Sequence, residues 1–152
     1  MSGREDKQWN DLFFTCSLIE YIARKTHNKR AYIVNQMGSA VLEHILSLSD
    51  VYHSDNIDDV SDRFITECNI IHGSYNNVSK GRYTIPSHWD IGKVYKRLIQ
   101  GASLHKNTVV IDELISVYNS DVSDLIQDYN SSFYYDPPQN ILNAYIYGML
   151  ED

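Results

Sequence analysis

The sequence lacks the features that would tie it to a disulfide scaffold, a zinc site or a membrane. Its 152 residues include two cysteines, Cys16 and Cys68, which lie far apart and have no partner at CxxC spacing. Both are therefore expected to be small core residues. Residues 1–10 are polar, and no later run approaches the roughly 18 apolar residues of a membrane-spanning helix. We expect a cytoplasmic protein without membrane contact.

Basic residues are absent from residues 107–152, which carry eight acidic ones. Elsewhere Lys and Arg number six against four Asp and Glu in residues 1–30, one against seven in residues 43–69, and six against one in residues 80–106. The net charge of −7 and the acidic blocks argue against nucleic acid binding over the whole surface. The basic block could face an acidic partner, or the acidic block of a second copy in a homo-oligomer.

Composition otherwise predicts an ordinary globular protein. Hydrophobic residues make up 43% of the chain and charged residues 22%, which is too apolar for a disordered chain. The length matches the commonest single-domain size, so one core is expected, without a structural metal or cofactor.

Apolar residues recur at steps of three and four along most of the chain, the spacing of helices with one buried face. This pattern predicts an all-α protein, a compact bundle of about six to eight short helices that could form two lobes. The expected helices cover residues 9–25, 29–37, 39–45, 57–71, 88–100, 109–118, 122–126 and 138–149, with a loop at residues 50–56.

Several residues at the ends of these helices have the chemistry of caps and breaks. Gly38 can end the second helix in a left-handed conformation. Ser87 followed three residues later by Asp90 predicts a capping box, and Pro137 with Pro138 can open the last helix.

Residues 73–86 are rich in turn-forming Gly, Asn and Ser, and they predict an irregular connector. The connector separates an N-terminal helical segment, residues 1–72, from a C-terminal one, residues 87–152. We expect both segments to belong to one compact domain.

No set of residues has the spacing of a catalytic site. Residues 53–55 are His, Ser and Asp, but neighbours in sequence rarely point at one another, so a loop and helix cap explains them better. His72 with the following Gly and Ser, after Ile70 and Ile71, resembles the strand followed by His-Gly-Ser in some ADP-ribosyltransferases, where the histidine helps to hold NAD, yet the chain after it is helical. Its acidic candidates would be Glu113 and Glu151. No catalytic residue is proposed, and an enzyme acting on NAD or nucleic acid is kept as an alternative.

Asp58, Asp59 and Asp62 are spaced so that their carboxylates share one helix face, where they could hold a hard cation. The segment lacks the alternating oxygen ligands and the glycine of an EF-hand loop. A solvated acidic face explains it better, and no metal is predicted.

Tyrosine is the one strong excess in the composition, with 12 residues. Tyrosine is enriched in protein interfaces because it combines a large ring with a hydroxyl that can stay in water, although it also serves in cores. We therefore expect a protein-binding surface at the C-terminal tyrosines, Tyr129, Tyr134, Tyr135, Tyr145 and Tyr147.

A basic helix face offers an alternative function. Lys93, Lys96 and Arg97 share a helix, and Thr108 heads the next one about ten residues later. This arrangement could be a helix-turn-helix, and the protein would then be a DNA-binding transcriptional regulator. A solvated face is the simpler explanation of the same residues.

Aromatic and apolar residues also form a longer pattern in the first half: Phe13, Cys16, Ile19, Glu20, Tyr21, Ala31, Tyr32, Gly38, Ile45, Tyr52, His53, Ile57, Asp59, Val60 and Phe64. It resembles a small bacterial helical family of unknown function, found in gene clusters beside ADP-ribosyltransferase-like toxins. The second half of the chain resembles another member of these clusters. The resemblance lies in residues 85–87, 89–95, 117–120, 130–132 and 134–135. The resemblance implies a non-enzymatic, antitoxin-like or accessory protein that binds the toxin-like enzyme encoded nearby.

Overall fold

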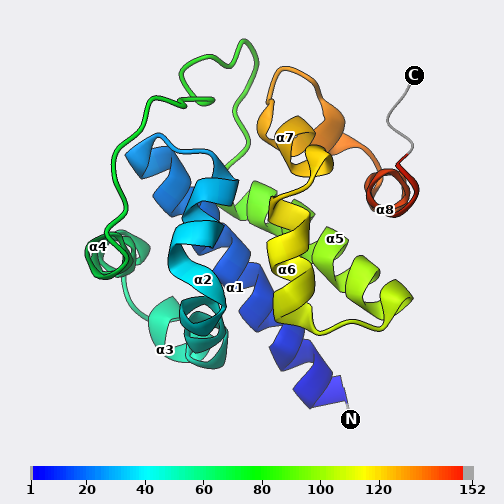
Figure 1. Cartoon of the computed structure of the whole chain (residues 1–152), viewed down its shortest axis with the longest axis horizontal. Coiled ribbons are helices and arrows are strands. Elements are labelled where there is room, and N and C mark those ends of the chain that lie inside the picture. Colours follow the sequence, from blue (N-terminus) through cyan, green and yellow to red (C-terminus); the bar gives the residue numbers. More distant parts are fainter. Residues whose placement is uncertain (1, 149–152) are drawn as a thin grey trace.

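The computed structural model describes residues 2–148, with side chains from residue 6 onward, and this part of the chain contains helices and no strand. The predicted all-α class is confirmed (Figure 1). None of the described helices combines the length and apolar character needed to cross a bilayer. The helices are α1 Ser2–Thr26, α2 Arg30–Ser47, α3 Ser49–His53, α4 Ile57–Glu67, α5 His88–Lys106, α6 Val110–Tyr118, α7 Asp121–Gln127, the 3₁₀ helix η1 Phe133–Tyr135, and α8 Pro138–Tyr147.

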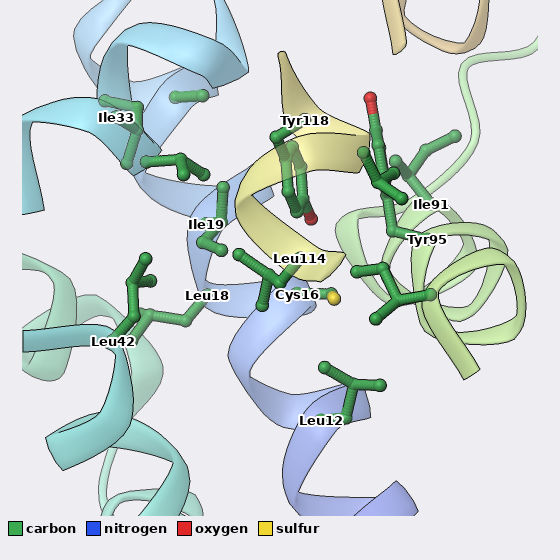
Figure 2. Close-up of a cluster of buried hydrophobic side chains, with 14 of the residues drawn as sticks. Leu12, Cys16, Leu18, Ile19, Ile33, Leu42, Ile91, Tyr95, Leu114 and Tyr118 are labelled. Carbon is green, nitrogen blue, oxygen red and sulfur yellow. The ribbon is translucent and has the colours of Figure 1, made fainter. Parts of the chain in front are cut away.

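Helix α1 is the centre of the bundle (Figure 1). It lies against α5 along much of its length and also contacts α2, α3 and α4, while α6 lies on α2 and α5, and α8 on α5 and α7. One hydrophobic core therefore includes residues from before and after the connector. Figure 2 shows Cys16 of α1 close to Tyr118 of α6 and Tyr95 of α5. The rings of Tyr95 and Tyr118 stack with their centroids 4.1 Å apart.

The predicted caps of α5 and α8 are present, and the predicted break at Gly38 takes another form. Gly38 has φ 77° and ψ 169°, which is not the left-handed helical conformation expected of a cap, and it kinks α2, which continues as helix on its far side. At the start of α5 the Asp90 N–H donates to Ser87 Oγ at 3.0 Å and the Ser87 N–H donates to Asp90 Oδ2 at 3.1 Å, completing the capping box. Pro138 begins α8 as predicted, while Met149 lies outside the described residues.

Two predictions about residues 48–72 are wrong. Part of the expected loop is the short helix α3, because Ser49 donates its hydroxyl to Ile45 O at 2.8 Å and Tyr52 buries its ring against Phe64. Helix α4 ends four residues early, so Ile71 is 71% exposed instead of joining the buried face. Cys68, the residue that follows α4, is only partly buried, whereas Cys16 is in the core.

The close approach of α1 and α5 at Gly92 provides a test of the fold. A Cβ at Gly92 would lie 2.1 Å from Ser17 Oγ and 2.9 Å from Ser17 Cα, so Gly92→Ala must push the helices apart. We expect a loss of about 1–3 kcal/mol in the free energy of unfolding, measured by urea titration. Gly101→Ala is the matched control, because its Cβ would meet only the end of the Leu142 side chain at 3.0 Å. Wild-type stability of Gly92→Ala would contradict the crossing.

Candidate partner-binding groove

A groove of about 780 Å³ lies between the connector, α5 and the segment that leads into α8. Buried Leu98 and Ile141 lie at its base, with half-buried Val94 beside them. Residues 83–86 of the connector form one wall and residues 134–138 the other. Its volume lies in the range of about 300–1,000 Å³ that is usual for ligand sites.

The groove brings together residues that the sequence assigned to competing surfaces. Tyr134 and Tyr135, from the predicted protein-binding cluster, line it together with Lys93 and Arg97, from the predicted basic face. Lys96 points elsewhere and is half-buried; burial lowers its pKa, and the positive charges of Arg97 and Lys93 lower it further. A partner in this groove would meet aromatic rings and cations at once.

The C-terminal tyrosines do not form one surface, which corrects the prediction. Tyr129 is 4% exposed and belongs to the core. Tyr145 is half-buried on α8 and directs its hydroxyl to Ser116 and Glu113. Tyr147 is 60% exposed but lies beside His105, outside the groove lining.

Behind the connector wall lies a buried ion pair that the sequence analysis missed. Glu20 of α1 and Arg30 of α2 are both fully buried. Arg30 donates from Nε to Glu20 Oε1 at 2.8 Å and from Nη2 to Glu20 Oε2 at 2.7 Å, a two-pronged contact. Arg30 Nη1 also donates to Asn28 O at 3.0 Å, and Arg30 Nη2 donates to Asn77 Oδ1 at 3.2 Å.

Arg24 and Tyr129 extend this pair to the groove. Arg24 donates from Nε to Glu20 Oε2 at 2.8 Å and from Nη2 to Pro86 O at 2.7 Å, and Pro86 is a groove residue. The Tyr129 hydroxyl donates to Glu20 and accepts from Arg24 at 3.0 Å. Its ring lies edge-on to Tyr134, 5.9 Å away, in the opposite wall. The ion pair therefore holds parts of both walls.

A second set of hydrogen bonds fixes the connector to α7. Asn77 is buried and donates from Nδ2 to Gln127 O at 2.8 Å. The side chain of Gln127 accepts from the Arg30 N–H at 3.0 Å and donates to Ser123 O at 2.9 Å. The irregular connector is thus held by side chains where it has no helix or sheet bonds.

The charges of the network determine its protonation. Burial alone would disfavour the Glu20 carboxylate, but Arg30, through attraction and hydrogen bonds, and Arg24 lower the pKa of Glu20 to about 2. Burial and the Glu20 charge raise the pKa of the Tyr129 hydroxyl, which stays protonated and can donate. The network therefore holds one carboxylate, two guanidinium groups and one neutral phenol at neutral pH.

The sequence around Glu20 contains one indication of this network. Helix α1 buries Cys16 and Ala23, and Glu20 lies between them at helical spacing, within the apolar stripe. A carboxylate in such a stripe needs a buried cation. The sequence did not show which of six basic residues in residues 1–30 would supply it.

The structure does not bring the other candidate residues into a reactive set. Ser54 Oγ donates to Val51 O at 2.7 Å, and no hydrogen bond among the described residues joins its side chain to His53 or Asp55. The His53 ring instead stacks on Phe14, 5.3 Å away. His72 is exposed in the irregular segment after α4, and no strand precedes it in the described chain.

The acidic face of α4 is tied to α1. The carboxylates of Asp58, Asp59 and Asp62 can approach within 4.8 Å of one another. Lys25 donates to Asp58 at 2.8 Å and to Asp62 at 2.6 Å, and Tyr21 donates to Asp58 at 2.8 Å. An ion pair between helices accounts for two of the three carboxylates.

The exposed face of α6 bears on the helix-turn-helix alternative, because α6 would be the recognition helix after α5. Its exposed positions are Asp112 and Ser116, and the helix contains no Lys or Arg. A recognition helix needs donors and positive charge toward DNA. The helix that follows the basic residues of α5 is thus poorly suited to be a recognition helix.

Comparisons with known proteins return no relative: no protein-family model, no curated protein and no solved structure matches the chain. Function must therefore be argued from the site itself. The site that the structure offers is the groove with the ion-pair network behind it.

Removing the charge of Glu20 tests the network. Glu20→Gln would leave Arg30 buried without its carboxylate, and we expect unfolding to become easier by about 3–5 kcal/mol in urea titrations. Glu67→Gln is the control, because Glu67 is exposed and should change stability by no more than about 0.5 kcal/mol. Equal effects of the two substitutions would refute the buried pair.

The lowered pKa of Glu20 predicts an acid dependence of stability. The Glu20 carboxyl has a pKa of about 2 in the folded protein against 4.5 in its ordinary state. Its contribution to stability is therefore complete above pH 4.5 and is lost as pH falls toward 2. In a carboxyl ¹³C NMR titration, Glu20 should stay ionised at pH 4.5 and become protonated only toward pH 2. A midpoint near pH 4.5 would contradict the prediction.

Proposed function

We propose that this chain is a non-enzymatic, cytoplasmic protein-binding module that holds a partner protein in the groove. Its resemblance to a family encoded beside toxin-like enzymes supports an antitoxin-like or accessory role, with such an enzyme as the partner. The groove supplies the physical basis of the proposal.

The observation that carries the proposal is aromatic surface exposed around a preformed apolar groove. Tyr135 is 85% exposed and Tyr83 is 66% exposed, and they belong to opposite walls. Large exposed aromatic side chains at an apolar recess are typical of protein interfaces, where tyrosine often dominates the binding energy.

The network behind the walls makes binding less costly. Arg24 fixes Pro86, and Tyr129 supports Tyr134, before any partner arrives. A site that is ordered beforehand loses less conformational entropy on binding. The buried polar groups of the network thus serve to position the walls.

The groove itself is poorly equipped for catalysis. Its lining contains no His, Cys or Ser, and its acids are Asp90 and Asp136. Asp90 is engaged in the capping box with Ser87. Covalent and hydrolytic mechanisms need a nucleophile activated by an adjacent base, and no hydrogen bond among the described residues joins the Thr84 hydroxyl or the Lys93 amine of this lining to such a base.

The same acids disfavour DNA as the occupant. Lys93 and Arg97 share the groove with Asp90 and Asp136, so phosphates would meet as many negative as positive side chains. A protein segment can place opposite charges and apolar groups at each of these positions.

Photo-crosslinking in the native host, with the neighbouring genes expressed, tests the proposal. A benzoylphenylalanine in place of Tyr135 should give a covalent adduct to one protein, identified by mass spectrometry. The matched control replaces Tyr147, an exposed tyrosine outside the groove lining, and should give none. Adducts to nucleic acid at position 135, or no protein adduct there, would overturn the proposed function.

A further inference from the structure

The connector wall contains backbone donors that have no partner among the described residues. Residues 84–87 are irregular, and within the described chain no hydrogen bond engages the N–H groups of Tyr83, Thr84 or Ile85. On either side the backbone is held, since the Arg82 N–H donates to Asn130 Oδ1 at 2.9 Å and Pro86 O accepts from Arg24. A fixed run of free N–H groups can pair with the backbone of an extended peptide.

The α5 side of the groove presents two cations that form no salt bridge among the described residues, although Asp90 and Asp136 line the same groove. Lys93 and Arg97 are exposed, and neither makes a salt bridge within the described part of the chain. They are one helical turn apart, so their Cβ atoms are about 5–6 Å from each other. Two positive charges at this spacing repel each other, and two carboxylates bound to them would relieve this repulsion.

The spacing of the cations selects a peptide pattern. In an extended chain, residues i and i+2 point the same way and are about 6.6–6.8 Å apart, close to the separation of Lys93 and Arg97. The peptide residue between these two positions, i+1, points to the other side, where Tyr134, Pro137 and Pro138 form an apolar wall. A peptide in which an apolar residue separates two acidic residues therefore matches both cations and the apolar wall.

We propose that the groove binds an extended segment of the partner protein in which one apolar residue separates two carboxylate residues. The carboxylates pair with Lys93 and Arg97, the apolar side chain lies against the Tyr134 wall, and the peptide backbone accepts a hydrogen bond from the connector. This inference rests on the proposed function and specifies the chemistry of its partner.

The probe is the synthetic peptide Gly-Pro-Glu-Leu-Glu-Pro-Gly, titrated into ¹⁵N-labelled protein at low salt. Saturable shifts of the Thr84 and Ile85 amide signals are expected. The isomer Gly-Pro-Glu-Glu-Leu-Pro-Gly and the peptide with both Glu replaced by Gln should bind about fivefold to tenfold more weakly, the scale of two exposed ion pairs.

Variants of the protein assign the effect to the cations. Lys93→Glu with Arg97→Glu should abolish the preference for the first peptide over its Gln form. Lys80→Glu is the control, because Lys80 is an exposed connector residue outside the groove lining, and the preference should persist.

The outcomes separate this inference from the proposed function. Equal affinity of the three peptides, or no saturable shift with any of them, overturns the carboxylate pattern. A protein adduct at position 135 would then still support a partner of different chemistry. Absence of both results would remove the function and the inference together.

Discussion

The buried pair of Glu20 and Arg30 is the interaction on which the arrangement of the molecule depends. Moving both charges out of water costs several kcal/mol each, and attraction offsets that cost only when the remaining hydrogen-bonding groups are satisfied. Here they are: Glu20 accepts from Arg24 and Tyr129 as well, and Arg30 also donates to Asn28 O. Because these groups come from α1, α2 and the segment after α7, the pair fixes how parts distant in sequence meet.

The groove walls need such a pair because they contain little regular structure. Residues 83–86 are irregular, and residues 134–138 include only the end of η1 and the first residue of α8, so backbone hydrogen bonds alone would leave their positions poorly defined. Arg24 holds one wall at Pro86, and Tyr129 supports the other. An apolar replacement of the ion pair could preserve stability, but it would not supply directed bonds to both walls. The pair thus contributes position more than net stability.

The sequence predicted the parts of the fold that depend on periodicity and caps, including the helical class, the interruption of helix at Gly38 and the start of α5. It failed at α3, where burial of Tyr52 against Phe64 outweighs weak local preferences. Lys93 and Arg97 were predicted as an exposed basic face, but the groove joins them to the tyrosine segment through contacts between distant parts of the chain. Tyrosine content alone could not separate buried Tyr129 from exposed Tyr135, because the ring suits both places.

The most direct test of the central claim is the solvent exchange of the Arg30 side chain, observed by ¹⁵N NMR at neutral pH. A guanidinium that is fully buried and paired with Glu20 should show an Nε–H signal that exchanges only through opening of the protein, far more slowly than that of exposed Arg63. This result would establish the buried pair on which the groove walls depend. Exchange of Arg30 as fast as that of Arg63 would mean that the pair is open to water, and the account of the groove would fail with it.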